Sequence, residues 1–260
     1  MRDLLRSIVA EKRAALARRH GSRELRALLD GAPPAPRDFR ATLAAPGLSI
    51  VAEIKRRSPS AGPLRADLDP GPLARALEAA GAAALSVLTE PVWFGGSPAD
   101  LGAARAATRL PVLRKDFLLE PSEMRESRLL GADAVLLIAR ILGPSQLDEL
   151  VAAATAVALA CVVEAHDERD LVRAIDCRAP VIGINGRDLD TLRVDLDGAL
   201  SLRARVPHDR LTLAESGVRT RADARAVAAR GFDAVLVGEA LMRAADPGAA
   251  LRELAGGAAP

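Results

Sequence analysis

The sequence predicts an α/β protein, a (β/α)8 TIM barrel in which eight parallel strands alternate with helices around one core. Three observations predict this fold class. Eight short apolar runs recur along the chain, amphipathic segments fill the intervals between them, and a length of 260 residues suits one barrel.

The eight apolar runs are rich in Val, Leu and Ile and nearly continuous, as expected for strands that are buried on both faces of a parallel sheet. A buried helix could imitate one such run but not eight. The runs are LSIVAEIK (48–55), ALSVLT (84–89), PVLRK (111–115), DAVLLI (133–138), LACVVE (159–164), PVIGIN (180–185), LTLAES (211–216) and DAVLVG (233–238).

Helix signals lie between the runs. The segments 72–80, 121–130 and 220–230 each end at a glycine, and the third starts from Thr220 as an N-cap with Asp223 three residues later. A doubly wound sheet is the competing fold, but the first turn, KRRSPSAGPLR, lacks the G-x-G-x-x-G pattern of such folds.

The segment before the first strand has a different pattern. Residues 1–29 predict one or two amphipathic helices, and GAPPAP (31–36) then breaks the chain. We therefore expect one domain over residues 1–260, with residues 1–45 as a helical extension packed on the barrel.

Composition excludes several classes of function. A net charge of +2 with scattered arginines gives no reason to expect a nucleic acid or an anionic membrane as partner. There is no signal-peptide pattern or apolar run long enough to span a bilayer. Cys161 and Cys177 form no disulfide framework or metal knuckle, so we expect a cytoplasmic protein without a metal or other cofactor.

Only three lysines and one asparagine occur in this arginine-rich and alanine-rich chain. Two of the lysines, Lys55 and Lys115, and the single Asn185 lie at the ends of predicted strands. A genome-wide bias in base composition would explain why arginine replaces lysine nearly everywhere in this chain. We therefore expect the few remaining lysines to lie where the chemistry of an amine is needed.

Other polar residues follow the same strands, and the carboxyl ends of barrel strands carry function in this fold class. Three carboxylates, two ammonium groups and an amide converge there, so we expect pKa values shifted toward neutrality and general acid–base chemistry. The residues at this rim are Glu53, Lys55, Ser58, Lys115, Glu164, Asn185, Arg187, Glu215 and Ser216, with the aromatic residues Trp93, Phe94 and Phe117.

The ends of the last two strands, ESGVRTRAD and VGEAL, predict a phosphate site. Gly217, Gly238 and Glu239 can present backbone N–H groups there, and the Ser216 hydroxyl can donate. Outside the rim, we expect His166 to be a surface histidine, and Lys12 and Gln146 to be solvated on helices.

These residues and their neighbours closely resemble the indole-3-glycerol phosphate synthase family over essentially the whole chain. The motifs that carry the resemblance are IVAEIKRRSPSAGPLR, LSVLTEPVWFGGSPADL, PVLRKDFLLE, VVEAHDERDL, IGINGRDL and LAESGVRTRAD. The resemblance implies ring closure of 1-(2-carboxyphenylamino)-1-deoxyribulose 5-phosphate to indole-3-glycerol phosphate, with loss of carbon dioxide and water, in tryptophan biosynthesis.

The resemblance also implies roles for the rim residues. Lys115 would be the general acid and Glu164 its acid–base partner. The catalytic set is Lys115, Glu164, Glu53, Lys55, Asn185, Glu215 and Ser216. The substrate-binding set is Ser58, Arg187, Phe94, Phe117, Leu88, Leu136 and Ile138, and the phosphate-binding set is Gly217, Gly238 and Glu239.

Two positions depart from the family's pattern. Gly186 stands where the family usually has a second asparagine, and Ala61 stands where it often has a lysine, a loss that Arg56, Arg57 or Arg65 could offset. We still expect an active enzyme on a phosphorylated small-molecule substrate. We expect it to be a monomer or to associate weakly with other tryptophan-pathway enzymes.

Two other interpretations stay open. The first is a neighbouring phosphate-binding barrel such as phosphoribosylanthranilate isomerase, which would need a Cys/Asp acid–base pair at the rim. The second is a non-catalytic barrel that binds phosphorylated metabolites or a partner enzyme, which would show gaps in the acid–base set.

Overall fold

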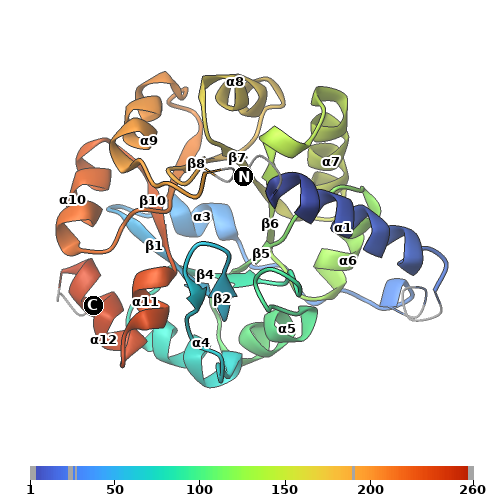
Figure 1. Ribbon diagram of the computed structural model, residues 1–260, viewed down its shortest axis with the longest axis horizontal. Coiled ribbons are helices and arrows are strands. Elements are labelled where there is room, and N and C mark those ends of the chain that lie inside the picture. The colour runs from blue at the N-terminus through green and yellow to red at the C-terminus, as the bar shows by residue number, and fades with distance from the viewer. Residues whose placement is uncertain (1–3, 23–25, 27, 189–190, 257–260) are drawn as a thin grey trace.

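A computed structural model describes residues 4–22, 26, 28–188 and 191–256. Within these residues, eight strands form one closed barrel, and all neighbouring strands are parallel (Figure 1). The barrel strands are β1 (Ser49–Ile54), β4 (Ala84–Leu88), β5 (Val112–Lys115), β6 (Ala134–Ile138), β7 (Ala160–Ala165), β8 (Val181–Asn185), β9 (Leu211–Glu215) and β10 (Ala234–Val237). The predicted fold class is therefore confirmed.

Each barrel strand coincides with one of the predicted apolar runs, to within a residue or two at its ends. The runs are continuous because strand residues are buried on both faces. Val51, Leu113, Val162 and Leu213 belong to a cluster that fills the barrel, whereas their neighbours in sequence pack in the layer between strands and helices. Alternate side chains of a strand point to opposite faces, which produces this division.

The helices form the outer ring of the barrel. They are α4 (Pro70–Ala79), α5 (Pro98–Ala107), α6 (Ser122–Leu129), α7 (Pro144–Ala156), α8 (Glu168–Asp176), α9 (Leu196–Leu202), α10 (Arg221–Ala229), α11 (Glu239–Arg243) and α12 (Pro247–Ala255), with the short 3-10 turns η1 (Ala139–Ile141) and η2 (Arg203–Arg205). Helix α10 begins with the predicted capping box, in which Thr220 and Asp223 each accept the other's backbone N–H. No helix in the described part of the chain is long and apolar enough to cross a bilayer.

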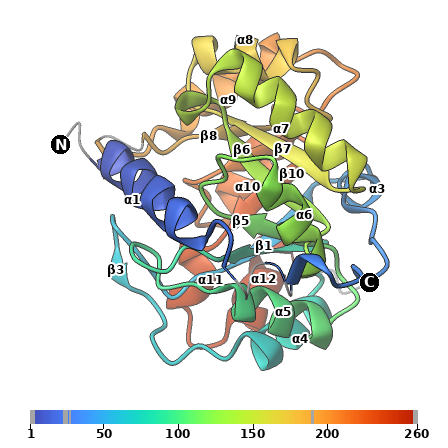
Figure 2. The same ribbon diagram turned by 90° about the vertical axis from the view of Figure 1, so that its right-hand side faces the viewer.

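Two of the helices that precede the barrel, α1 and α3, lie at its opposite ends. Helix α1 (Leu4–Arg19) is on one side of the barrel and α3 (Phe39–Leu43) is on the other (Figure 2). Phe39 and Leu43 are buried against the barrel interior, and Ser49, the first residue of β1, donates to the carbonyl of Thr42. Helix α3 therefore closes the end from which the strands start, whereas α1 lies over the end at which they finish.

Of the one or two helices expected over residues 1–29, α1 accounts for the chain as far as Arg19, and residues 26, 28 and 29 are helical as well. Residues 1–3, 23–25 and 27 of that expectation lie outside the described residues. The loop after β1 also contains a two-stranded hairpin that the sequence did not predict, formed by β2 (Arg57–Ser58) and β3 (Gly62–Pro63).

Candidate active site

Four charged residues project into the barrel mouth because of the two-residue repeat of a strand. Each stands two positions after an aliphatic residue that fills the barrel, so its side chain points inward as well, one layer higher. The four are Glu53 after Val51, Lys115 after Leu113, Glu164 after Val162 and Glu215 after Leu213.

One cavity opens at this mouth, and the structure brings every residue of the predicted catalytic, substrate-binding and phosphate-binding sets to its lining. The predicted residues found there are Glu53, Lys55, Ser58, Leu88, Phe94, Lys115, Phe117, Leu136, Ile138, Glu164, Asn185, Arg187, Glu215, Ser216, Gly217, Gly238 and Glu239. Trp93, also expected at the rim, does not line the cavity and donates from its indole N–H to Glu11 of α1. The sequence missed other lining residues, most notably Leu4, Leu5 and Ile8 of helix α1. Nothing in their local pattern distinguishes them from ordinary residues of an amphipathic helix.

Lys115 is the centre of the mouth. Its Nζ donates to Oε2 of Glu164 at 3.0 Å and to Oε2 of Glu215 at 2.8 Å. Both carboxylate side chains are 1% exposed, whereas the lysine is 16% exposed toward the cavity. The ammonium group is therefore held between two buried carboxylates and still faces the space where a substrate would lie.

Lys55 forms a second ion pair, with Oε1 of Glu53. The two residues share one face of β1, as their spacing predicts. Two glycines make room for these carboxylates: a Cβ on Gly238 would collide with Glu53, and a Cβ on Gly183 would collide with Glu215. Gly238 thus has a packing reason of its own, in addition to any contact with phosphate.

We call Glu53, Lys55, Lys115, Glu164 and Glu215 the inner cluster. It contains three carboxylates and two ammonium groups, so one carboxylate lacks a matching cation within the cluster. Burial raises the pKa of Glu215; Lys115 opposes this shift and Glu164 adds to it. A protonated Glu215 would remove the excess negative charge.

The pKa values of Lys115 and Glu164 move away from neutrality, contrary to the expectation from the sequence. Burial would lower the pKa of Lys115, but Glu164 and Glu215 outweigh it and raise this pKa. Burial would raise the pKa of Glu164, but Lys115 and then His166 lower it. The expectation was wrong because it treated burial as dominant, whereas direct pairing decides the direction here. Lys115 is therefore protonated and can donate a proton, whereas Glu164 is ionised and can accept one.

The rest of the cavity wall is apolar. Phe94 and Phe117 lie with ring centroids 6.1 Å apart, beside Leu88, Leu136 and Ile138. Buried Glu90, a residue the sequence analysis overlooked, accepts the backbone N–H groups of Val92, Trp93 and Phe94 and so fixes the loop that carries Phe94. Such a wall suits a flat aromatic group.

The opposite part of the rim contains a tight backbone turn after β9. Ser216 and Gly217 both have positive φ, 64° and 93°, and both line the cavity. Asn185 accepts the N–H of Arg187, and the Arg187 guanidinium lies 3.5 Å from the Glu239 carboxylate. In the described part of the chain, no group of three or more His, Cys, Asp or Glu side chains could hold a metal ion.

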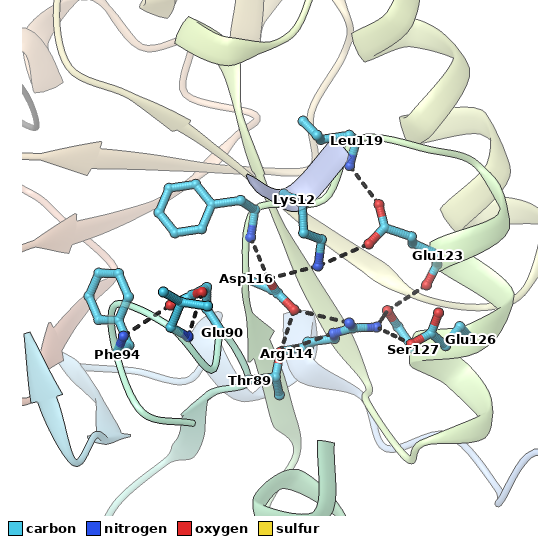
Figure 3. Close-up of polar contacts among 12 residues, drawn as sticks. Lys12, Thr89, Glu90, Phe94, Arg114, Asp116, Leu119, Glu123, Glu126 and Ser127 are labelled. Atoms are coloured by element: carbon cyan, nitrogen blue, oxygen red, sulfur yellow. Dashed lines mark hydrogen bonds and ion pairs between the residues drawn. The ribbon is translucent and has the colours of Figure 1, made fainter. Parts of the chain in front are cut away.

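A second group of charges lies on the other face of β5 (Figure 3). We call it the outer cluster: Arg114, Lys12, Arg19, Asp116, Glu123 and Glu126. Arg114 donates to Asp116 at 3.0 Å, and Lys12 lies 3.0 Å from Asp116 and 3.2 Å from Glu123. Glu126 is paired with Arg19 at 3.1 Å and with Arg114 at 3.6 Å. Three cations thus meet three carboxylates.

The outer cluster corrects the expectation that Lys12 is solvated. Lys12 lies on α1, its side chain is only 14% exposed, and both of its carboxylate partners are buried. Gln146 was also expected to be solvated, yet it donates to the carbonyl of Leu119 at 2.7 Å. Both partners lie on distant segments, which the pattern of a single helix cannot reveal.

The expectation that His166 lies on the surface is wrong as well. Its side chain is 2% exposed and lies between the carboxylates of Glu164 and Asp170. The position immediately after a strand and next to a helix cap pointed to a loop residue. Glu164 two positions earlier was the one signal that could have placed it at the rim.

The two departures from the family pattern fit their surroundings. A Cβ on Gly186 would lie 3.1 Å from the carbonyl oxygen of Asp195, so a side chain would require the neighbouring loop to move. Ala61 supplies no cation at its own position. The three arginines of the same loop that could offset this loss all contact other groups: Arg56 pairs with Asp100, Arg57 donates to the carbonyl of Val92, and Arg65 donates to the carbonyls of Met242 and Ala244.

Comparisons with known proteins match one family along nearly the whole chain. A family model described as indole-3-glycerol phosphate synthase matches residues 5–254. Indole-3-glycerol phosphate synthase 2 of Streptomyces coelicolor is 49% identical over 259 residues, which cover 98% of this chain and 100% of the relative. The indole-3-glycerol phosphate synthase of Albidiferax ferrireducens is 46% identical and covers 98% of each chain.

Solved structures show the same fold at low sequence identity. A 3-hexulose-6-phosphate synthase superposes with a TM-score of 0.64 at 22% identity, over 82% of this chain and 100% of that one. A thiamine phosphate pyrophosphorylase from Pyrococcus furiosus gives 0.61 at 19% identity, over 84% and 96%. At these identities the likeness concerns the barrel alone.

Proposed function

The chain belongs to the indole-3-glycerol phosphate synthase family, and we propose how its inner cluster performs the reaction. The activity is ring closure of 1-(2-carboxyphenylamino)-1-deoxyribulose 5-phosphate to indole-3-glycerol phosphate, with release of carbon dioxide and water, in tryptophan biosynthesis. The single observation that carries the mechanism is Lys115, held between Glu164 and Glu215 at the end of an apolar cavity.

In the first step, the ring carbon that bears the carboxylate attacks the ribulose carbonyl carbon. A new carbon–carbon bond forms, and the carbonyl oxygen takes a proton from the Lys115 ammonium group. Loss of carbon dioxide then returns the electron pair of the broken bond to the aromatic ring. Because its pKa is raised, Lys115 is protonated when the substrate arrives. Its proton becomes easier to transfer once the ammonium group turns from Glu164 and Glu215 to the substrate oxygen, since these two carboxylates contribute most to raising the pKa.

In the second step, the hydroxyl formed on the new ring leaves as water. It needs a proton donor, and the adjacent carbon must lose a proton to form the indole double bond. Glu164 accepts that proton, and a protonated Glu215 supplies the one that leaves with the hydroxyl. The proton on Glu164 and one proton from solvent then restore Lys115 and Glu215 for the next turnover.

The substrate would lie across the mouth. Phe94, Phe117, Leu88, Leu136 and Ile138 would enclose the aromatic ring, and Lys55, oriented by Glu53, would hold the substrate carboxylate. Backbone N–H groups at Ser216, Gly217, Gly238 and Glu239, with the Ser58 hydroxyl nearby, would bind the phosphate. Asn185 and Arg187 would position the chain of hydroxyl groups between these two ends.

The isomerase interpretation finds no support at the rim. Cys161 and Cys177 both pack in the layer between strands and helices, and burial raises their pKa values to about 12 and about 11. Neither thiol could act as an acid–base residue at the mouth. The interpretation as a non-catalytic barrel predicts gaps in the acid–base set, and the inner cluster shows none.

We further propose that residues 1–260 act as one domain, with residues 1–45 as its N-terminal extension. The enzyme would work in the cytoplasm, where thiols such as the two free, buried cysteines remain reduced. It would take only a phosphorylated small molecule as substrate, without a metal or other cofactor. It would be a monomer or associate weakly with other tryptophan-pathway enzymes.

The direct test incubates the purified protein with 1-(2-carboxyphenylamino)-1-deoxyribulose 5-phosphate and follows indole fluorescence. We expect steady formation of indole-3-glycerol phosphate that scales with protein concentration. A chain with the circular dichroism of a folded α/β protein and no product above the buffer rate would contradict the proposed function.

A further inference from the structure

His166 is a buried histidine that the proposed mechanism does not use. It follows the last residue of β7, and its side chain is 2% exposed. Its Nε2 lies 3.2 Å from Oε1 of Glu164, and its Nδ1 lies 3.7 Å from Oδ2 of Asp170. The ring therefore stands between the proposed catalytic carboxylate and the first turn of helix α8.

The two oxygens of Glu164 face different partners. Oε2 accepts from Lys115 at 3.0 Å, whereas Oε1 is buried and accepts no hydrogen bond from the described residues. The group that faces Oε1 within ion-pair distance is His166 Nε2, in a contact not yet aligned as a hydrogen bond. A small rotation of the ring would align it.

The far side of the ring faces a group of charges, although its Nδ1 makes no hydrogen bond with the described residues. Asp170 accepts the backbone N–H of His166 at 3.3 Å and is paired with Arg140 at 3.2 Å. Arg140 lies on η1, directly after β6, and also contacts Asp167, the N-cap of α8, at 3.0 Å. Together these contacts connect the ends of two strands to one side of the imidazole.

The proposed reaction makes the position of His166 important. When Lys115 turns to the substrate carbonyl, its hydrogen bond to Oε2 weakens, and Glu164 loses its strongest partner. Asn185 on β8 helps to lower the pKa of the same carboxylate, and His166 remains the group that faces the second oxygen. A carboxylate that must accept a proton needs a fixed orientation at that moment.

We propose that His166 is a positioning residue, whose Nε2–H holds Oε1 of Glu164 while Lys115 engages the substrate. This inference rests on the role proposed for Glu164. His166 acts through that carboxylate and does not itself touch the substrate. Asp170 and Arg140 in turn fix the ring from its Nδ1 side.

Two amide substitutions separate the two sides of the ring. The amide nitrogen of Gln can occupy the place of Nε2, whereas that of Asn occupies the place of Nδ1. We expect His166→Gln to keep kcat within about threefold of the wild type. We expect His166→Asn to lower kcat by about 10- to 100-fold, the range seen when a supporting partner of a functional ligand is removed. KM should change little in both.

Thermal unfolding of both variants checks that equal folded fractions are compared, and His208→Asn, at an exposed histidine, is the matched control. Equal losses of kcat in His166→Gln and His166→Asn, or wild-type kcat in His166→Asn, would overturn the proposal. So would an effect of His166→Asn confined to stability or to KM.

A double variant tests whether His166 acts through Glu164. If it does, Glu164→Gln and the double variant Glu164→Gln/His166→Asn share the same kcat, because nothing remains to be positioned. Losses that multiply would contradict the proposal. Near-normal kcat in Glu164→Gln alone would instead show that the role proposed for Glu164 is wrong, which separates the two possible failures.

Discussion

Arg114 and Lys115 are neighbours on β5, yet they belong to two charge clusters of different character. The outer cluster around Arg114 lies between α1, α6 and the barrel and balances three cations against three carboxylates. Arg114 and the three carboxylates are buried, whereas Arg19 is 42% exposed and Asp116 also borders the cavity. The inner cluster around Lys115 has two cations for three carboxylates and lines the cavity.

The polar atoms of the two clusters differ in the same way. In the outer cluster, Asp116 accepts from Thr89, Arg114, Lys12 and the backbone of Phe117. Oε1 of Glu123 and Oε1 of Glu126 accept no hydrogen bond from the described residues, but each lies 3.1–3.6 Å from a cation. In the inner cluster, Oε1 of Glu215 is buried with neither a hydrogen bond nor an ion pair to any described residue. A charge-balanced cluster serves the fold, whereas a cluster with an excess carboxylate beside a cavity has a charged group that can interact with a substrate.

The largest effect that we predict belongs to the outer cluster. Arg114→Met should lower the free energy of unfolding by about 3–5 kcal/mol, because it leaves Asp116 and Glu126 buried without their shared cation. Urea unfolding measures this loss. Arg225→Met, on an exposed position of α10, is the control and should stay within about 0.5 kcal/mol of the wild type.

Folded Arg114→Met should retain most of its turnover, since Arg114 does not reach the cavity. A loss of stability below about 1 kcal/mol, or a loss of kcat comparable to that of an inner-cluster variant, would remove the distinction between the two clusters.

The next prediction concerns the excess carboxylate of the inner cluster. Because the pKa of Glu215 is raised in the folded chain, the folded state holds a proton that the unfolded state has released. The free energy of unfolding should therefore fall as pH rises from the ordinary pKa of a glutamate to the raised one, by at most about 1.4 kcal/mol per pH unit.

Glu215→Gln is neutral at every pH and should flatten this slope, as urea unfolding at several pH values between about 6 and 9 would show. Glu149→Gln, exposed on α7, is the matched control and should leave the slope unchanged. A slope in Glu215→Gln equal to that of the wild type would mean that Glu215 is already ionised in the folded chain.

The smallest effect that we predict is a change in KM on substitution of Lys12, the outer-cluster residue that holds helix α1 near the cavity. Lys12 ties α1 to Asp116 and Glu123, and the same helix places Leu5 and Ile8 in the cavity wall. Lys12→Met should therefore raise KM by up to about tenfold, which is about 1.4 kcal/mol, with little change in kcat.

Arg13→Met, at the next and exposed position of α1, controls for loss of charge and should leave KM unchanged. An unchanged KM in Lys12→Met would show that the ion pairs do not hold the helix over the site.

The sequence alone predicted the barrel and the rim because both depend on local repeats. Continuous apolar runs marked the strands, and position at the carboxyl end of a strand was enough to place Glu53, Lys115 and Glu164 at one mouth. The two-residue alternation then fixes which side chains face inward.

What the sequence could not predict depends on contacts between distant segments. Lys12 and Asp116 are 104 residues apart, and nothing in the sequence of α1 indicates that its lysine pairs with a buried aspartate. The burial of His166 likewise depends on Asp170 and on Arg140 from the preceding unit of the barrel. The directions of the pKa shifts follow from such pairings, which is why the expectation of near-neutral values failed for Lys115 and Glu164.

The most direct test of the central claim is the turnover of Lys115→Met at saturating substrate, measured by indole fluorescence beside Arg114→Met at equal folded concentration. Lys115→Met should lose at least about 100-fold in kcat, the scale of a positioned general acid, while Arg114→Met retains most of its turnover. Turnover of Lys115→Met within about twofold of the wild type would contradict the claim that the inner cluster carries the reaction.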